Sequence, residues 1–384
     1  MDRIRLPPRH PWLMHINAQM PRQKPQPLPY SKPPSMSDVA RAAGVHQTTV
    51  SRALRNDPRI PEATSRRVRR VAERLHYRPN PMVSALIALR RSRHPHRFPV
   101  TLAFVAHTSG RWRRTQPRLF TFAYEAHLAG ARAAAERQGY HVELFPIDSP
   151  GMTERRLNEI LFTRNIPGLI IGSFPDAHGQ FVLDWERFCT VVIEYTFTQP
   201  AFDRIVHDSY DGMRQIMGEC ARRHHDRVGL MLTAAGHERT EYLNGAAYWM
   251  EQKSGRRFAA IPPLFVAAWD EREFEAWHAK HRPQVIVTSN ALIPDFMALC
   301  EKKGWRLGTD IHLVNVNAAA EGPETGIYQD PFMTGVTAAR MVIERIGRNA
   351  RGIPERRQTI LTQGRWIDGS TMGQAPLSRV SSAL

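Results

Sequence analysis

The chain has 384 residues, of which 42% are apolar, enough to bury the core of a large body as well as that of a small module. Its net charge of +17 is unevenly distributed: residues 1–98 contain 20 basic and five acidic residues, whereas the remaining 286 residues carry a net charge of only +2. A positive charge confined to one end is typical of a module that binds a polyanion. No stretch approaches the roughly 20 consecutive apolar residues that a membrane-spanning helix needs, which favours nucleic acid over membrane as the partner.

The first 34 residues are rich in arginine and proline and show no hydrophobic period. We therefore expect residues 1–34 to form a disordered basic arm that adds nonspecific contacts to phosphate. Translation starting further downstream, near Met14 or Met20, is the alternative. The arm lacks the continuous apolar segment of a secretory signal peptide, which favours a cytoplasmic, nucleoid-associated protein.

The pattern of apolar, capping and turn residues at 35–80 predicts a helix-turn-helix unit made of three short helices. Ser35 and Asp38 have the spacing of a capping box, which starts the first helix. Gly44 allows a tight turn into the second helix, and Pro61 opens the third, which is needed to bury the apolar face of the first two. The predicted core of this headpiece consists of Val39, Ala40, Ala43, Val45, Val50, Leu54, Val68, Val71, Ala72 and Leu75.

The polar side of the second helix is the candidate for DNA contact, because a recognition helix presents such side chains to the major groove. The residues on this side are Gln47, Thr48, Ser51 and Arg52. Arginine pairs with O6 and N7 of guanine and glutamine with N6 and N7 of adenine, so Arg52 and Gln47 are the first candidates for base recognition; contact with phosphate or solvent is the alternative. His46 and Thr49 near the helix start contact phosphate or cap the helix.

From residue 98 onward, short apolar runs alternate with amphipathic segments. The runs fall at residues 100–105, 168–171, 190–193, 228–232, 285–287 and 313–316. Strands that alternate with helices predict parallel sheets built from βαβ units. We expect an α/β body of two Rossmann-like subdomains over residues 98–372, followed by a tail at 373–384 without leucine heptads, and hence a dimer.

Three linked motifs in the headpiece resemble the LacI/GalR family of bacterial transcription regulators. They are DVARAAGV at residues 38–45, TVSRAL at 49–54 and YRPN at 77–80. The resemblance implies a hinge helix and linker at 81–97 that folds on operator DNA, with Leu86 inserted into the minor groove and Val83 beside it. Leu86 as an ordinary core residue, or Ile87 or Leu89 packing across a dimer, are the alternatives.

The resemblance extends over residues 98–372 and implies a body like that of periplasmic binding proteins, with dimerisation through this body and an effector between the two subdomains. The side chains expected at the effector site are Tyr124, Glu194, Tyr242, Asn290, Asn317 and Gln329. Tyr124 as a core aromatic residue and Glu194 as a solvent-exposed carboxylate remain open.

The effector site departs from the family pattern. Tyr242 stands where the family has a clamping arginine, and a phenol does not replace a guanidinium fork. Arg239, one turn away, is a candidate substitute. Ala291, Asn317 and Ala318 stand where acidic residues are usual, so a standard sugar effector is not implied.

These features predict a homodimeric repressor that binds a pseudo-palindromic operator in double-stranded DNA and responds to a small-molecule effector. A small-molecule binding protein with a vestigial or architectural headpiece, and a DNA-binding dimer without a ligand, are the alternatives. No glycine-rich phosphate loop, HExxH, GxSxG or CxxC motif occurs, so we expect neither an enzyme nor a cofactor. Without metal-ligand spacing, the cysteines predict no metal but free buried thiols, at Cys189, Cys220 and Cys300.

Overall fold

The computed structural model describes residues 35–54, 57, 59–75, 77, 100–108, 119–254 and 258–373, with backbone alone for 119–123. The predicted arm at 1–34, the hinge at 81–97 with Val83 and Leu86, and the tail beyond residue 373 lie outside the described residues. Within the described part, no helix is both long and apolar enough to cross a membrane.

The headpiece consists of three helices, α1 (Met36–Ala43), α2 (Gln47–Ala53) and α3 (Glu62–Arg74). The predicted capping box is confirmed at the start of α1: the Asp38 amide donates to Ser35 Oγ at 3.3 Å, and the Ser35 amide donates to the Asp38 carboxylate at 2.8 Å. Gly44 ends α1 with φ of 62°, a conformation that glycine adopts without steric cost. These local signals set the turn between α1 and α2.

The three helices share one small core. Its buried members are Val39, Ala40, Ala43, Val50, Ala53, Val68, Val71 and Ala72. Alanine at the contact points of α1 allows the helix axes to approach closely. The partly buried side chains of Val45, Leu54 and Leu75 close this core at its edge, so all ten predicted core positions contribute to it.

The N-terminal lobe is a six-stranded parallel sheet with the strand order β13-β7-β5-β3-β1-β2. Its strands are β1 (Val100–Ala106), β2 (Tyr140–Pro146), β3 (Gly168–Ile171), β5 (Cys189–Ile193), β7 (Asp203–His207) and β13 (Thr359–Thr362). One face packs against α6 (Leu119–Glu136) and α13 (Pro331–Arg348), and the other against α7 (Glu154–Thr163) and the 3-10 turn η2 (Trp185–Arg187). A two-stranded ribbon, β4 (Gly179–Gln180) and β6 (Phe197–Gln199), lies beside this sheet.

The C-terminal lobe repeats this three-layer arrangement. Its sheet has the order β14-β12-β11-β10-β8-β9, in which β14 alone is antiparallel to its neighbour. The strands are β8 (Val228–Thr233), β9 (Leu264–Val266), β10 (Val285–Thr288), β11 (His312–Asn315), β12 (Thr325–Tyr328) and β14 (Arg365–Ile367). The helices α8 (Ser209–Arg222) and α10 (Leu243–Lys253) cover one face, and α11 (Glu271–His281) and α12 (Ile293–Lys303) the other.

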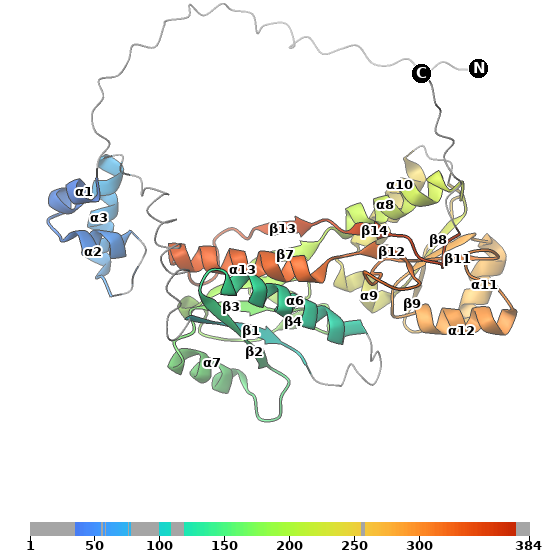
Figure 1. Ribbon diagram of the computed structural model, residues 1–384, viewed down its shortest axis with the longest axis horizontal. Coiled ribbons are helices and arrows are strands. Elements are labelled where there is room, and N and C mark those ends of the chain that lie inside the picture. The colour runs from blue at the N-terminus through green and yellow to red at the C-terminus, as the bar shows by residue number, and fades with distance from the viewer. Residues whose placement is uncertain are drawn as a thin grey trace, which may run out of the picture.

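The chain passes between the lobes three times, from β7 to α8, from β12 to α13 and from β13 to β14 (Figure 1). Each lobe is therefore assembled from segments distant in sequence, and the carboxyl ends of the parallel strands meet between the lobes. This architecture confirms the predicted fold class, a helical headpiece followed by two Rossmann-like subdomains.

A close crossing of α6 and α13 positions one wall of the space between the lobes. A Cβ atom on Gly130 of α6 would lie 1.9 Å from the carbonyl oxygen of Phe332, and one on Gly335 of α13 would lie 1.9 Å from that of His127. Larger residues at either glycine would push the helices apart. The crossing therefore requires both glycines, and it brings His127 and Thr334 to the same wall.

Candidate DNA interface and interlobe cavity

The exposed side of α2 carries the residues predicted to contact DNA. Arg52, Thr48 and Gln47 are exposed, whereas Thr49 and Ser51 are half-buried. The Gln47 amide nitrogen donates to Ser37 Oγ of α1, which fixes the direction of this side chain. The structure thus presents a row of polar groups on α2 opposite the buried Val50.

His46 acts as the N-terminal cap of α2. Its Nδ1 accepts from the Thr48 amide at 3.4 Å and lies 2.9 Å from Thr48 Oγ1. The capping role considered from the sequence is therefore present. The exposed ring remains accessible to a phosphate group.

The exposed surface of the headpiece is strongly basic. The α3 helix exposes five arginines, Arg66, Arg67, Arg69, Arg70 and Arg74. The nearby acidic Asp57 is paired with Arg59 at 2.7 Å, and hydrogen bonds from Arg59 hold the pKa of this carboxyl well below its usual range. A polyanion that approaches this module meets a positive field.

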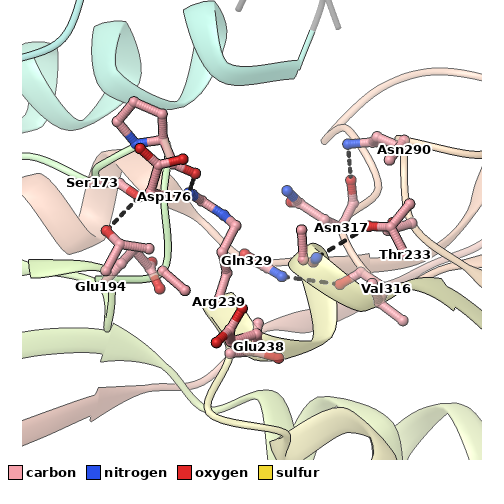
Figure 2. A pocket seen from close by; sticks show the side chains of 18 of the residues that line it. Ser173, Asp176, Glu194, Thr233, Glu238, Arg239, Asn290, Val316, Asn317 and Gln329 are labelled. Carbon is pink, nitrogen blue, oxygen red and sulfur yellow. Dashed lines mark hydrogen bonds between the residues drawn. The ribbon is translucent and has the colours of Figure 1, made fainter. Parts of the chain in front are cut away.

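A cavity of about 490 Å³ lies between the two lobes, within the size range of small-molecule sites. Its lining comes from the carboxyl ends of strands in both sheets. These residues include His107 after β1, Ser173 after β3, Glu194 after β5, Thr233 at the end of β8, Asn290 after β10, Asn317 after β11 and Gln329 after β12 (Figure 2). A ligand held here touches both lobes at once.

Five of the six residues expected at the effector site line this cavity, namely Tyr124, Glu194, Asn290, Asn317 and Gln329. Tyr242 does not: its side chain is 57% exposed and packs on His237, with 5.0 Å between the ring centroids. Glu241 and Tyr242 both have positive φ, 48° and 62°, so the chain turns between α9 (Ala234–Arg239) and α10 and carries Tyr242 away from the cavity. Arg239 lines the cavity instead.

Arg239 links the C-terminal lobe to the N-terminal lobe. One guanidinium nitrogen donates to the carbonyl oxygens of Phe174 and Pro175, and the other donates to Ser173 Oγ at 3.1 Å. Figure 2 shows Arg239 reaching toward the segment that carries Ser173 and Asp176. Burial lowers the pKa of Arg239 to about 10, partly offset by the nearby Glu194 and Asp176. Much of its hydrogen-bonding capacity is thus used within the protein.

Two further contacts of acidic side chains beside Arg239 also cross between the lobes. Glu238 Oε1 lies 3.0 Å from Nε2 of His178, and Glu241 Oε1 accepts from the buried Arg204 at 3.1 Å. The short segment 238–241 therefore holds the N-terminal lobe at three points.

Glu194 is the acidic residue most strongly affected by its surroundings in the cavity wall. Burial raises the pKa of its carboxyl to about 7, against the opposing effects of Arg239 and of a hydrogen bond from the His207 backbone. Its φ of 68° turns the side chain out of the strand direction at the end of β5.

On the opposite wall, the carboxamides hold one another in place. The Asn290 amide nitrogen donates to the carbonyl oxygen of Asn317 at 3.0 Å, and the Asn290 amide oxygen accepts from Asn315. The Gln329 amide nitrogen donates to the carbonyl oxygen of Val316 at 3.0 Å (Figure 2). The C-terminal wall is therefore preorganised by hydrogen bonds.

Several cavity residues escaped the sequence prediction, among them His107, His127, Asp176, His178 and Glu238. His107, Asp176 and His178 follow apolar runs that the sequence analysis recognised as strands. Inspecting the residues after every predicted strand would therefore have found them. His127 and Glu238 gave no such signal, because they reach the cavity from helices. Among the described residues no group of three or more metal-ligating side chains occurs, and the three cysteines are free and buried.

The fold and these two sites define a DNA-binding transcription regulator with a body like that of periplasmic binding proteins. The profile of bacterial regulatory proteins of the lacI family matches residues 35–80, and that of the periplasmic binding protein-like domain matches residues 217–372. The chain therefore combines a helix-turn-helix domain of the lacI type with a periplasmic-binding-protein-like domain, and the relatives that it matches are transcription regulators.

Similar curated proteins are transcription regulators, and similar solved structures share the fold. The transcriptional regulator PtxS of Pseudomonas putida is 24% identical over 328 residues, which cover 82% of this chain and 86% of that protein. The structure of the regulator CelR in complex with cellobiose has a TM-score of 0.53 at 19% identity, covering 88% of this chain and 99% of CelR. The lac repressor dimer bound to operator and an anti-inducer has a TM-score of 0.51 at 18% identity, covering 89% of this chain and all of that chain. The relatives are transcription regulators rather than enzymes.

Proposed function

We propose that this protein is a dimeric repressor that binds a pseudo-palindromic operator. A small molecule in the interlobe cavity lowers or raises its affinity for that operator. The observation that carries the proposal is the pairing of an exposed polar face on α2 with a cavity lined from both lobes of the body. It acts in the cytoplasm at the nucleoid, and it is not an enzyme.

In this proposal the headpiece at 35–80 reads the operator through α2. Arg52 and Gln47 contact base edges in the major groove with Thr48 and Ser51 beside them, and His46 and Thr49 contact phosphate. The segment 81–97 supplies the hinge, with Val83 and Leu86 at the minor groove. The basic segment 1–34 adds contacts that do not depend on sequence.

The effector acts by favouring one angle between the lobes. A ligand that touches Glu194 on one side and Gln329 on the other binds most tightly when the lobes hold both groups at the right separation. It can shift the equilibrium between two arrangements only by its difference in affinity for them. The complex of CelR with cellobiose supports a small polar effector in a related fold.

The dimer contact includes the outer side of the C-terminal lobe. Trp249 and Met250 of α10 and Phe265 of the edge strand β9 are 43%, 56% and 39% exposed. Exposed large apolar side chains beside a sheet edge are typical of a surface that another subunit covers. A dimer with two headpieces reads two half-sites, which accounts for a pseudo-palindromic operator.

Selection of double-stranded oligonucleotides by the full chain, followed by footprinting, tests the proposal. We expect a two-fold symmetric site that is protected at physiological salt. An absence of preference over random DNA would refute sequence-specific regulation and leave a binding protein with an architectural headpiece.

Replacing Arg52→Ala tests the assignment of α2. We expect a loss of about 1 to 3 kcal/mol in discrimination at one base pair. Arg74→Ala is the matched control, because it removes the same charge from the exposed end of α3. Equal weakening on specific and random DNA by Arg52→Ala would make Arg52 a phosphate contact.

A second function is favoured by the contacts of segment 238–241, which join the lobes through side chains of the protein itself. In this alternative the protein is a DNA-binding dimer with a permanently closed body. Thermal-shift screening with sugars, sugar acids and nucleobases separates the two, because a ligand of the folded state raises the melting temperature with its saturation.

A further inference from the structure

We propose that the effector carries a protonated amino group, which the carboxylates of the interlobe cavity bind. This inference rests on the proposed function and adds the chemical class of the ligand. It follows from the charge of the cavity wall, from the direction of its hydrogen bonds and from a buried imidazole.

The described cavity wall carries more negative than positive charge. Asp176 and Glu194 come from the N-terminal lobe and Glu238 from the C-terminal lobe, whereas Arg239 supplies the single guanidinium among the described lining residues. Arg239 points at the main-chain carbonyls of the N-terminal lobe and not at an open anion site. A cationic ligand restores the balance of charge, and an anionic ligand would increase the repulsion.

The histidines of the wall do not reverse this balance. Burial lowers the pKa of His127 to about 4, and burial also lowers the pKa of His107. The His127 ring is therefore neutral at pH 7, and burial favours the neutral form of His107 as well. His178, the other histidine among the described lining residues, lies with its Nε2 3.0 Å from Glu238 Oε1.

The hydrogen-bonding groups of the cavity wall also favour a cationic ligand. The amide nitrogens of Asn290 and Gln329 and two guanidinium nitrogens of Arg239 already donate to protein oxygens. The carboxylates and the amide oxygen of Gln329 are acceptors. The three carboxylates of the wall fit an ammonium group, which has three donors and no acceptor, and disfavour a carboxylate or phosphate, which has acceptors only.

His127 provides an independent indication that a polar ligand belongs here. His127 is one of the residues that line the cavity and is 4% exposed, and its Nδ1 is buried with no hydrogen-bond partner within the described part of the protein. A buried polar atom without a partner costs free energy. A ligand with several hydrogen-bonding groups relieves that cost while its ammonium group pairs with Glu194.

The experiment uses the full chain and two sets of matched probes. The cyclic set is glucose, glucosamine and glucuronate, and the linear set is 1,4-butanediol, putrescine and succinate. Thermal shift and titration calorimetry at pH 7.5 compare the members of each set. We expect the amine of at least one set to bind at least tenfold more tightly than its neutral and acidic counterparts.

Two variants locate the contact. Glu194→Gln and Glu238→Gln each keep the shape of the side chain, and we expect Glu194→Gln to weaken amine binding about tenfold or more. Glu159→Gln on the exposed side of α7 is the matched control, because it removes a carboxylate outside the cavity and should leave amine binding unchanged. Persistence of full amine affinity in both cavity variants would overturn the proposal.

The outcomes separate this inference from the proposed function. Tighter binding of the neutral or acidic member, or no binding of either amine, overturns the amine proposal and leaves a regulator with another effector. Amine binding without sequence-specific DNA binding supports the amine site and overturns the regulator.

Discussion

The functional side chains of the headpiece and those of the interlobe cavity are held in position in different ways. In the headpiece, one short helix carries the candidate DNA contacts, and a core of eight buried residues orients it. In the cavity, the side chains come from strand ends in two lobes and are held by hydrogen bonds to one another. A change in the headpiece should therefore act locally, whereas a change in the cavity should alter how the lobes meet.

The largest expected effect is that of Val50→Asp in the headpiece. Val50 is fully buried, and an unpaired carboxylate there costs more than so small a core supplies. We expect the headpiece to unfold and DNA binding to be lost, while the thermal unfolding of the body is unchanged. Calorimetry and DNA gel shifts measure the two effects.

Ala42→Asp is the control for Val50→Asp, because Ala42 is exposed on α1 and the same charge is added without burial. It should leave the headpiece folded. A lower melting temperature of the body in Val50→Asp would show that the two regions are not independent.

The next effect is that of Arg239→Ala in the cavity. This change leaves the carbonyl oxygens of Phe174 and Pro175 without a charged donor and removes a positive neighbour of Glu194. We expect a loss of about 3 kcal/mol in the free energy of unfolding and a larger radius of gyration as the lobes separate. Urea unfolding and small-angle scattering measure both.

Arg272→Ala, on the exposed side of α11, is the matched control and should change neither quantity. Loss of stability without a change in the radius would mean that Arg239 supports one lobe and does not hold the two together.

Glu194→Gln should change the pH dependence of stability. The pKa of Glu194 is about 7 in the folded protein and near 4.5 when exposed, so folding favours the protonated form. Its contribution is fully present below pH 4.5 and is lost as the pH rises through 7. We expect Glu194→Gln to gain about 2 kcal/mol over the wild type between pH 5 and pH 8, a value reduced for the partial exposure of the side chain.

Urea unfolding at several pH values measures this gain, with Glu159→Gln as the control that should show no such trend. A stability difference that does not vary with pH would show that Glu194 titrates normally.

The contrast between the two regions also explains what the sequence could predict. In the headpiece, the capping box, Gly44 and the apolar spacing act over a few residues, so they are readable without a tertiary structure. In the body, Glu194 was found because it directly follows an apolar run, whereas Asn290 and Asn317 were expected from the resemblance to the family. The architecture of both lobes was predictable because apolar runs alternate with amphipathic segments.

The rest of the cavity depends on contacts that leave no local pattern. Tyr242 was placed at the effector site because it stands where the family has a clamping arginine. The positive φ values of Glu241 and Tyr242 turn the chain there, so Arg239 lines the cavity and Tyr242 does not. His127 reaches the wall only because α6 and α13 cross closely at two glycines. Such positions follow from tertiary packing, which periodicity does not encode.

The smallest expected effect is that of Ser35→Ala, which removes the cap of α1. Because Ser35 Oγ accepts from the Asp38 amide, we expect the headpiece to lose about 1 kcal/mol. Ser35→Thr keeps the hydroxyl and should retain most of this stability. Hydrogen exchange of the α1 amides measures the loss directly, and the amides of α6 in the body should exchange at unchanged rates. Equal loss in both variants would mean that the packing around residue 35, and not its hydroxyl, stabilises the start of the headpiece.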